Sequence, residues 1–141
     1  MDIVSRKLGI FLRKEGFNGE CNVYRWNLEY KNIKDNKLNT ERLHFTPLDK
    51  DNHNDLPSRV SAPSYFQVLE WLRKKHFIHI YSRYQCSVNE VLDFYYNIDF
   101  MINSFKVSNE VVKSIDMDEE KTLIQAITLA LTKIKTRHEG I

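Results

Sequence analysis

The chain has 141 residues and a mass of 16.8 kDa, a size that is typical of one domain. Hydrophobic residues make up 42% of the chain and aromatic residues 12%, which is enough for a packed core and excludes disorder throughout. The 21 Lys and Arg residues against 19 Asp and Glu leave a formal net charge of +2, so no large field of one sign attracts nucleic acid or an acidic membrane. Four glycines leave little from which to build a glycine-rich phosphate-binding loop.

Cysteine content and the first residues argue against a secreted or membrane protein. Cys21 and Cys86 are too few for a disulfide-stapled scaffold or a four-cysteine zinc site. Arg13, Lys14 and Glu15 interrupt the first apolar stretch before it can serve as the hydrophobic region of a signal peptide. No run approaches the ~18–20 apolar residues needed to cross a bilayer. We therefore expect a cytoplasmic protein that does not contact a membrane.

The first third of the chain predicts a helix followed by a β-hairpin. Apolar residues recur at helical spacing over 3–15, and Gly16 can take the left-handed conformation that ends a helix. Alternation of apolar and polar residues predicts a strand over 21–30, with Arg25 on the polar side. Residues 34–37 have the composition of a hairpin tip, and the segment around Leu43 and Phe45 is the expected return strand.

The middle of the chain predicts an exposed loop and then a capped helix. Residues 46–60 are rich in Asp, Asn and Pro and contain few apolar side chains, which is typical of a loop at the surface. Ser64 with Gln67 three residues later fits a capping box at the start of the next helix. Arg73, Lys74 and Lys75 place positive charge in its last turn, where the helix dipole favours it.

The second half predicts three strands and a last helix. The expected strands are 77–84, 93–103 and a shorter one around 111–115 that turns through Ser108, Asn109 and Glu110. The segment 93–103 has the longest alternation in the chain and indicates a strand with one buried face. Asp116 with Glu119 fits a second capping box, and a wide apolar stripe predicts a helix that ends near Lys135. Residues 136–141 are expected to be a tail.

These elements predict one α+β domain over residues 1–141. The order is helix, two strands, helix, three strands, helix. An antiparallel sheet of four to five strands with three helices against one face buries these apolar stripes in the simplest way.

No cluster of residues predicts catalysis, a cofactor or a metal. His76 and His79, with Asp99 or Glu90 as a third ligand, have a spacing that suggests a metal site, but the two histidines fall across a helix end and a strand start and need not converge. Cys86 with one of these histidines is a conceivable nucleophile pair, yet nothing around it resembles a nucleophile elbow. We therefore expect a protein that is not an enzyme and holds no cofactor.

The order of elements from Ser61 onward is also that of a double-stranded RNA-binding domain. Such domains present a basic start of the last helix to the phosphates, whereas residues 116–120 here are mostly acidic and would repel them. Basic residues exceed acidic ones by 14 to 10 up to His76, while the balance after it is 7 to 9. Arg73, Lys74 and Lys75 are the candidate nucleic-acid contacts, and ordinary solvated helix ends explain the same residues.

Aromatic residues off the predicted core stripes suggest a protein interface. Trp71 and Tyr95, with Met101 nearby in the pattern, are the candidate anchors, because aromatic and Met side chains are enriched in interfaces. If helices cover one face of the sheet, the other face is free to meet a second copy or a partner.

The segment from Ser61 to Ile80 resembles small uncharacterised proteins of phages and mobile elements in Bacteroides-type bacteria. It carries an Ala-Pro helix opening, a Trp-Leu pair near the helix end and an immediate strand, and the residues from Lys14 to Phe17, Cys21 and Tyr24 are similar as well. The resemblance implies an α+β domain and transfers no catalytic residue. We expect a non-enzymatic protein that acts through protein contacts, with a homodimer as one form and a nucleic-acid-binding accessory protein as the alternative.

Overall fold

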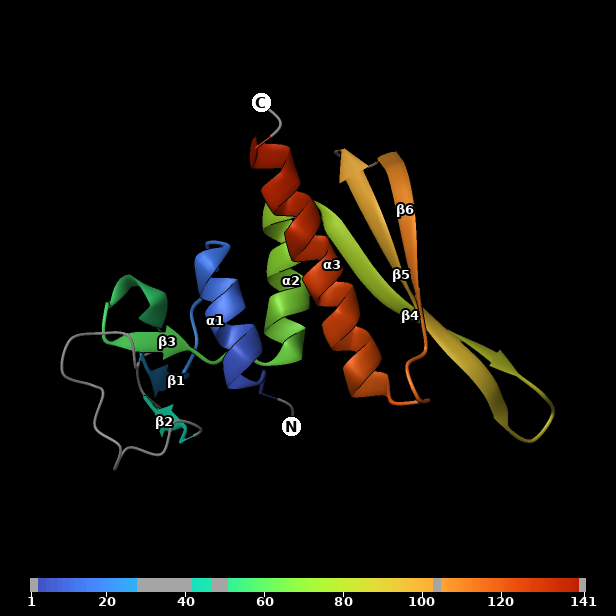
Figure 1. Cartoon of the computed structure of the whole chain (residues 1–141), viewed down its shortest axis with the longest axis horizontal. Helices are drawn as coiled ribbons and strands as arrows, with labels where there is room; N and C mark the ends of the chain where they lie inside the picture. Colours follow the sequence, from blue (N-terminus) through green and yellow to red (C-terminus); the bar gives the residue numbers. More distant parts are fainter. Residues whose placement is uncertain (1–2, 28–41, 47–50, 103–104, 140–141) are drawn as a thin grey trace. The chain divides into compact units, whose positions relative to one another are not determined.

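Figure 1 shows a computed structural model of the chain, in which residues 3–27, 42–46, 51–102 and 105–139 are described. The chain divides into two compact units, Met1–Val68 and Leu69–Ile141. The described residues form three α-helices and two antiparallel three-stranded sheets, one sheet in each unit. The predicted α+β class with three helices is therefore confirmed, and the strands are divided between two sheets instead of forming one.

The first unit is built from one helix and short strands. Its elements are α1 (Arg6–Lys14), β1 (Val23–Trp26), β2 (His44–Phe45), the 3-10 helix η1 (His53–Asp55), β3 (Arg59–Ser61) and the start of α2 (Tyr65–His76). The strand order is β2-β1-β3. Ser5 caps α1 by accepting a hydrogen bond from the Leu8 amide at 3.2 Å, and Gly16 ends it with φ +86°, as predicted. The predicted hairpin tip at 34–37 lies outside the described residues.

Helix α1 packs closely against the sheet of the first unit at Gly9. A Cβ atom at this position would lie 3.3 Å from the Ser61 carbonyl oxygen, so the absence of a side chain allows the close approach. The guanidinium of Arg25 is buried and donates to the Val4 carbonyl oxygen at 2.9 Å. The prediction of a half-buried strand was therefore wrong at Arg25, which is buried on the polar side of β1, where a hydrogen bond to the chain before α1 compensates its burial.

The expected exposed loop at 46–60 is wrong in part, because it contains η1, the start of β3 and the fully buried His53. Asn52 caps η1 by accepting from the Asn54 amide at 3.1 Å. The Asn54 side chain donates to the Phe17 carbonyl oxygen at 2.9 Å and accepts from the Ser61 amide at 2.9 Å. The polar residues that suggested a solvated loop are thus hydrogen-bond partners of the backbone.

One of the two predicted capping boxes is confirmed. The Ser64 hydroxyl accepts from the Gln67 amide at 3.2 Å, and the Gln67 side chain accepts from the Ser64 amide at 2.8 Å. At the last helix the cap is Asp118, whose carboxylate accepts from the Lys121 amide at 3.0 Å. Asp116 instead lies in a turn with φ 52°, so the box with Glu119 was wrong.

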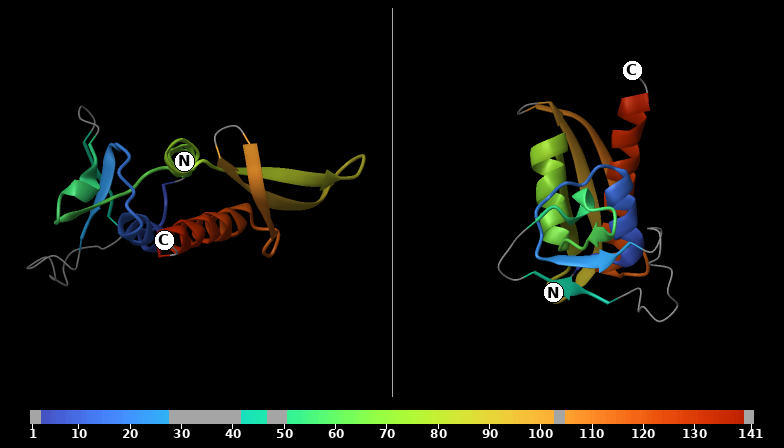
Figure 2. Two further views of the ribbon diagram at one scale, coloured as in Figure 1. Left: turned by 90° about the horizontal axis from the view of Figure 1, so that it is seen from above. Right: turned by 90° about the vertical axis from the view of Figure 1, so that its left-hand side faces the viewer.

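The second unit contains β4 (Ile78–Cys86), β5 (Val91–Ile102), β6 (Phe105–Lys113) and α3 (Glu119–Glu139), in sheet order β4-β5-β6. The predicted turn at Ser108–Glu110 is wrong, because these residues lie within β6 and pair with β5. The expected tail from 136 is also wrong, since α3 continues to Glu139. In Figure 2, α3 and the part of α2 that belongs to this unit lie on one side of the sheet. Buried apolar side chains of the sheet and of α3 are Ile78, Ile80, Phe94, Tyr96, Ile98, Phe100, Ala126, Ile127, Ala130, Leu131 and Ile134.

A buried histidine connects η1 to the sheet of the first unit. His53 is 0% exposed, and its Nε2 lies 3.0 Å from the Cys21 carbonyl oxygen while its Nδ1 lies 3.3 Å from an Arg59 guanidinium nitrogen. These partners assign the neutral ring with its proton on Nε2, because the carbonyl can only accept and the guanidinium can only donate. The Arg59 guanidinium also lies 4.2 Å from the centre of the Tyr24 ring.

We expect the first unit to lose stability as the pH falls from about 7 to about 5. Burial, followed by nearby arginine cations, lowers the pKa of both His44 and His53. Below the ordinary histidine pKa of about 6.5, the unfolded chain therefore binds protons more readily than the folded one, at a cost of up to about 1.4 kcal/mol per pH unit for each histidine. Urea denaturation followed by Trp26 fluorescence, in a Trp71→Phe background, measures this loss.

The substitution His53→Gln is the control for this pH dependence. It removes one titrating ring and keeps a neutral donor and acceptor, so the free energy of unfolding should change less between the two pH values. A starting protein that is equally stable at both pH values would contradict the assignment of neutral buried rings.

Candidate functional site

The second sheet has two faces of opposite chemistry, which its register defines. Ile78, Ile80, Ile98 and Phe100 are buried on the face towards α3, and the residues between them point to the other side. This other side is called the open face here, because the described part of the second unit places no helix on it. Its residues form rows across the strands: His79, Asp99 and Asn109; Tyr81, Asn97 and Val111; Arg83, Tyr95 and Lys113; Gln85 and Asp93.

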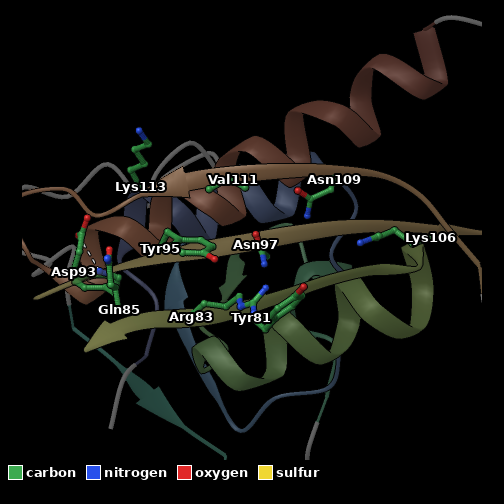
Figure 3. Close-up of a pocket in the computed structure, with 11 residues that line it drawn as sticks. Tyr81, Arg83, Gln85, Asp93, Tyr95, Asn97, Lys106, Asn109, Val111 and Lys113 are labelled. Carbon is green, nitrogen blue, oxygen red and sulfur yellow. Dashed lines mark hydrogen bonds between the residues drawn. The ribbon is translucent and has the colours of Figure 1, made fainter. Parts of the chain in front are cut away.

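The open face is hollowed over about 560 Å³ and is mostly polar. Figure 3 shows its side chains in front of the strands and the helices behind them. A register shift between Phe100 and Met101 pairs Met101 with Lys106, which brings Lys106 onto the same face. The lining thus combines three cations, amides and two tyrosines with the carboxylate of Asp93, while Asp99 lies on the same face in the row of His79.

Both carboxylates on the open face have partners. Asp99 is nearly buried and accepts from the Asn109 side chain at 2.7 Å. Asp93 accepts from the Ser114 hydroxyl at 2.7 Å and from the Phe94 amide at 2.8 Å. These two hydrogen bonds lower the pKa of Asp93, so it carries a negative charge at one end of the hollow at neutral pH.

The acidic start of α3 contacts the opposite face of the sheet. The Glu119 carboxylate accepts from the Tyr84 hydroxyl at 2.7 Å and from the Tyr96 hydroxyl at 3.3 Å. The pKa of Tyr96 is raised by burial first and by this carboxylate second. Glu119 therefore attaches α3 to β4 and β5, and the acidic charge that argues against duplex RNA binding at this helix is partly structural.

Two of the three predicted interface anchors lie on the open face. Tyr95 and Met101 are half-buried residues of β5 on that side of the sheet. Trp71 is only 8% exposed, and its ring packs edge-on against His76 with 4.6 Å between ring centres. It is therefore a poor surface anchor. The predicted nucleic-acid contacts Arg73, Lys74 and Lys75 are all exposed at the end of α2, where Lys74 pairs with Glu70 at 2.7 Å.

The residues considered for metal binding and nucleophilic catalysis do not converge on one site, although two of them are cross-strand neighbours. His79 lies in β4 opposite Asp99, while His76 ends α2 and contacts Trp71. Cys86 is exposed at the far end of β4, seven residues from His79 and thus about 23 Å away along the strand. Within the ranges that the structure describes, no group of three or more His, Cys, Asp or Glu residues can hold a metal ion.

Sequence reasoning missed the outer edge of the second sheet. β6 is an edge strand, and its side chains Phe105, Val107 and Val111 are 77%, 57% and 48% exposed. Ile102 of β5, which pairs with Phe105, is 61% exposed as well. The run of β-branched and aromatic residues over 105–112 could have indicated this strand, but the Ser-Asn pair within it suggested a turn.

Comparisons of the chain with protein-family models, with curated proteins and with solved structures found no match. Of the helices that the structure describes, none is long and apolar enough to cross a membrane.

We expect Glu119→Ala to lower the free energy of unfolding by about 1–2 kcal/mol, because two tyrosine hydroxyls lose their shared charged acceptor. Far-UV circular dichroism during urea denaturation measures the change. Glu119→Gln keeps an acceptor oxygen and should lose less than half as much. If the alanine variant unfolds at the same urea concentration as the starting protein, Glu119 does not hold α3 to the sheet.

Proposed function

We propose that this protein is a non-enzymatic module of a phage or mobile element that acts through protein contacts, and that it pairs with a second copy of itself through β6. The observation that carries the proposal is that β6 is an edge strand on which the apolar side chain of Val111 is exposed, with Phe105 and Val107 exposed farther along it. An edge strand offers unpaired backbone N–H and C=O groups, and exposed apolar side chains beside them favour pairing with another strand.

The sequence of β6 suits antiparallel pairing of two copies. A pairing centred on Val111 sets this residue opposite Val111 of the other copy and sets Lys113 opposite Asn109. No like charges face each other in this register, and the apolar pair lies on the two-fold axis. The bulge before Ser108 and the lysines at both ends of β6 limit how far the pairing extends.

A pairing of this size supports a weak dimer. One strand edge buries less area than the ~1,200 Å² of a stable interface, so the dimer is expected to exchange with monomer at micromolar concentrations. The open face itself does not favour a face-to-face dimer, because Arg83, Lys106 and Lys113 would be desolvated against their own copies.

The proposal includes a cytoplasmic location. Both cysteines are free, Cys21 buried and Cys86 exposed, and this supports a reducing compartment.

A second candidate function is binding of nucleic acid. Exposure of Arg73, Lys74 and Lys75 at the end of α2 favours it, because three adjacent cations can contact phosphates. This contact would weaken steeply with added salt, whereas pairing through an apolar edge would not.

Sedimentation equilibrium over a concentration series tests the pairing of β6. We expect the average mass to rise towards twice the 16.8 kDa of one chain as the concentration increases, and Val111→Lys to hold it near one chain. The lysine opposes its own copy on the two-fold axis. Val88→Lys is the matched control, since Val88 is 98% exposed between β4 and β5 and away from β6. A starting protein that stays monomeric, or a Val111→Lys variant that still dimerises, would refute pairing through this edge.

A further inference from the structure

We infer that the open face of the second sheet binds single-stranded nucleic acid, with bases stacked on Tyr81 and Tyr95 and phosphates held by Arg83, Lys106 and Lys113. This inference deepens the second candidate function, because it moves the contact surface from the end of α2 to the sheet. It does not depend on the pairing of β6.

The two tyrosines are placed as neighbouring platforms for bases. Tyr81 in β4 pairs with Asn97 in β5, and Tyr95 lies two residues from Asn97 on the same face. Diagonal neighbours of this kind lie about 7–8 Å apart, close to the spacing of successive bases in an extended strand. Both rings are partly exposed in the hollow, and Figure 3 shows them on the side away from α3. Stacking on an aromatic ring is available to every base, so the surface would be tolerant of sequence.

Three cations lie on the same face as the tyrosines, two of them beside Tyr95 and the third farther along the sheet. Arg83 and Lys113 occupy the same row as Tyr95, one on each side of it, while Lys106 is opposite Met101. All three cations are exposed, and phosphates following the bases across the rows come within their reach. Each contact between a cation and a phosphate releases a counterion. The affinity for single-stranded nucleic acid would therefore fall clearly as the salt concentration rises.

Two carboxylates on the face oppose phosphates and limit the affinity. Asp99 is nearly buried and hydrogen-bonded to Asn109, and because solvent screens its carboxylate little, it opposes a phosphate that passes over the row of His79. Asp93 is exposed at one end of the hollow and charged, so it repels a phosphate that passes Gln85. The three cations leave a small positive excess, which predicts modest affinity.

The alternatives fit this face less well. A regular duplex keeps its bases stacked on each other and presents phosphates and base edges but no base faces, so it cannot stack on Tyr81 or Tyr95. An apolar protein partner would bury three cations against only two carboxylates that already have partners, which is costly. A single strand supplies both a stacking surface and the missing negative charge.

Fluorescence anisotropy of a labelled oligouridylate of about 12 nucleotides, within the usual range of single-strand sites, measures the binding. We expect saturable binding at low salt, and a slope of log K against log salt of about −2, as three phosphate contacts require. The corresponding duplex should bind at least tenfold more weakly.

Substitutions on the face separate stacking from charge. Tyr95→Leu should weaken binding about tenfold, while Tyr95→Phe should leave it within twofold, because the ring and not the hydroxyl provides the stacking surface. Asp93→Asn should tighten binding, since it removes the exposed repelling charge and keeps an oxygen that can accept from Ser114. This gain cannot arise from misfolding.

Two charge-matched triple variants locate the surface. Removing Arg83, Lys106 and Lys113 together should abolish the salt dependence, whereas removing Arg73, Lys74 and Lys75 together should leave binding within a fewfold. The reverse result would refute the open face and leave nucleic-acid binding at the end of α2 standing. Absence of binding to the single strand at low salt would refute both, and equal binding of the duplex would refute stacking on the tyrosines.

Discussion

The pairing of β5 with both of its neighbours is the constraint on which the second unit depends. Because side chains alternate along a strand, one register decides both that Ile98 and Phe100 pack beneath α3 and that Tyr95 and Asn97 belong to the open face. A shift of one residue would expose the core and bury the polar row together. Stability and surface chemistry in this unit therefore depend on the same hydrogen-bond ladder, which makes the register strongly specified.

Period-two and helical spacing were enough to predict the class of the fold, the three helices and the strands β4 and β5, but not the extent of β6. The alternation over 93–103 identified β5, and the apolar stripe identified α3, because both elements bury a continuous face. Local composition gave wrong predictions where polar residues hydrogen-bond to other parts of the protein or pair within a sheet. Ser108 and Asn109 suggested a turn but lie in β6, and Asn54 suggested a solvated loop but bridges Phe17 and Ser61. A single sequence does not show which polar side chains bond to the backbone.

The candidate site was predictable only in part, for a related reason. Tyr95 and Met101 were identified because they fall out of phase with the core stripe of their own strand. Arg83, Lys106 and Lys113 lie on other strands, and they join Tyr95 only through the cross-strand register. Trp71 was misplaced, since the helical stripe alone did not show its contact with His76. A surface whose residues come from several strands can be predicted only when the pairing of the strands is known. The periodicity of one sequence does not contain this pairing.

The register shift between Phe100 and Met101 divides β6 into two half-strands of opposite phase. Counted continuously from Lys113, alternation would direct Lys106 towards α3, yet the extra residue rotates it to the other side. One inserted residue thus transfers a full positive charge from one face of the sheet to the other without changing any buried side chain. In such a strand, the number of residues between two paired positions decides which face of the sheet carries a charged side chain. The charge of each face therefore depends on this number as much as on the residue types.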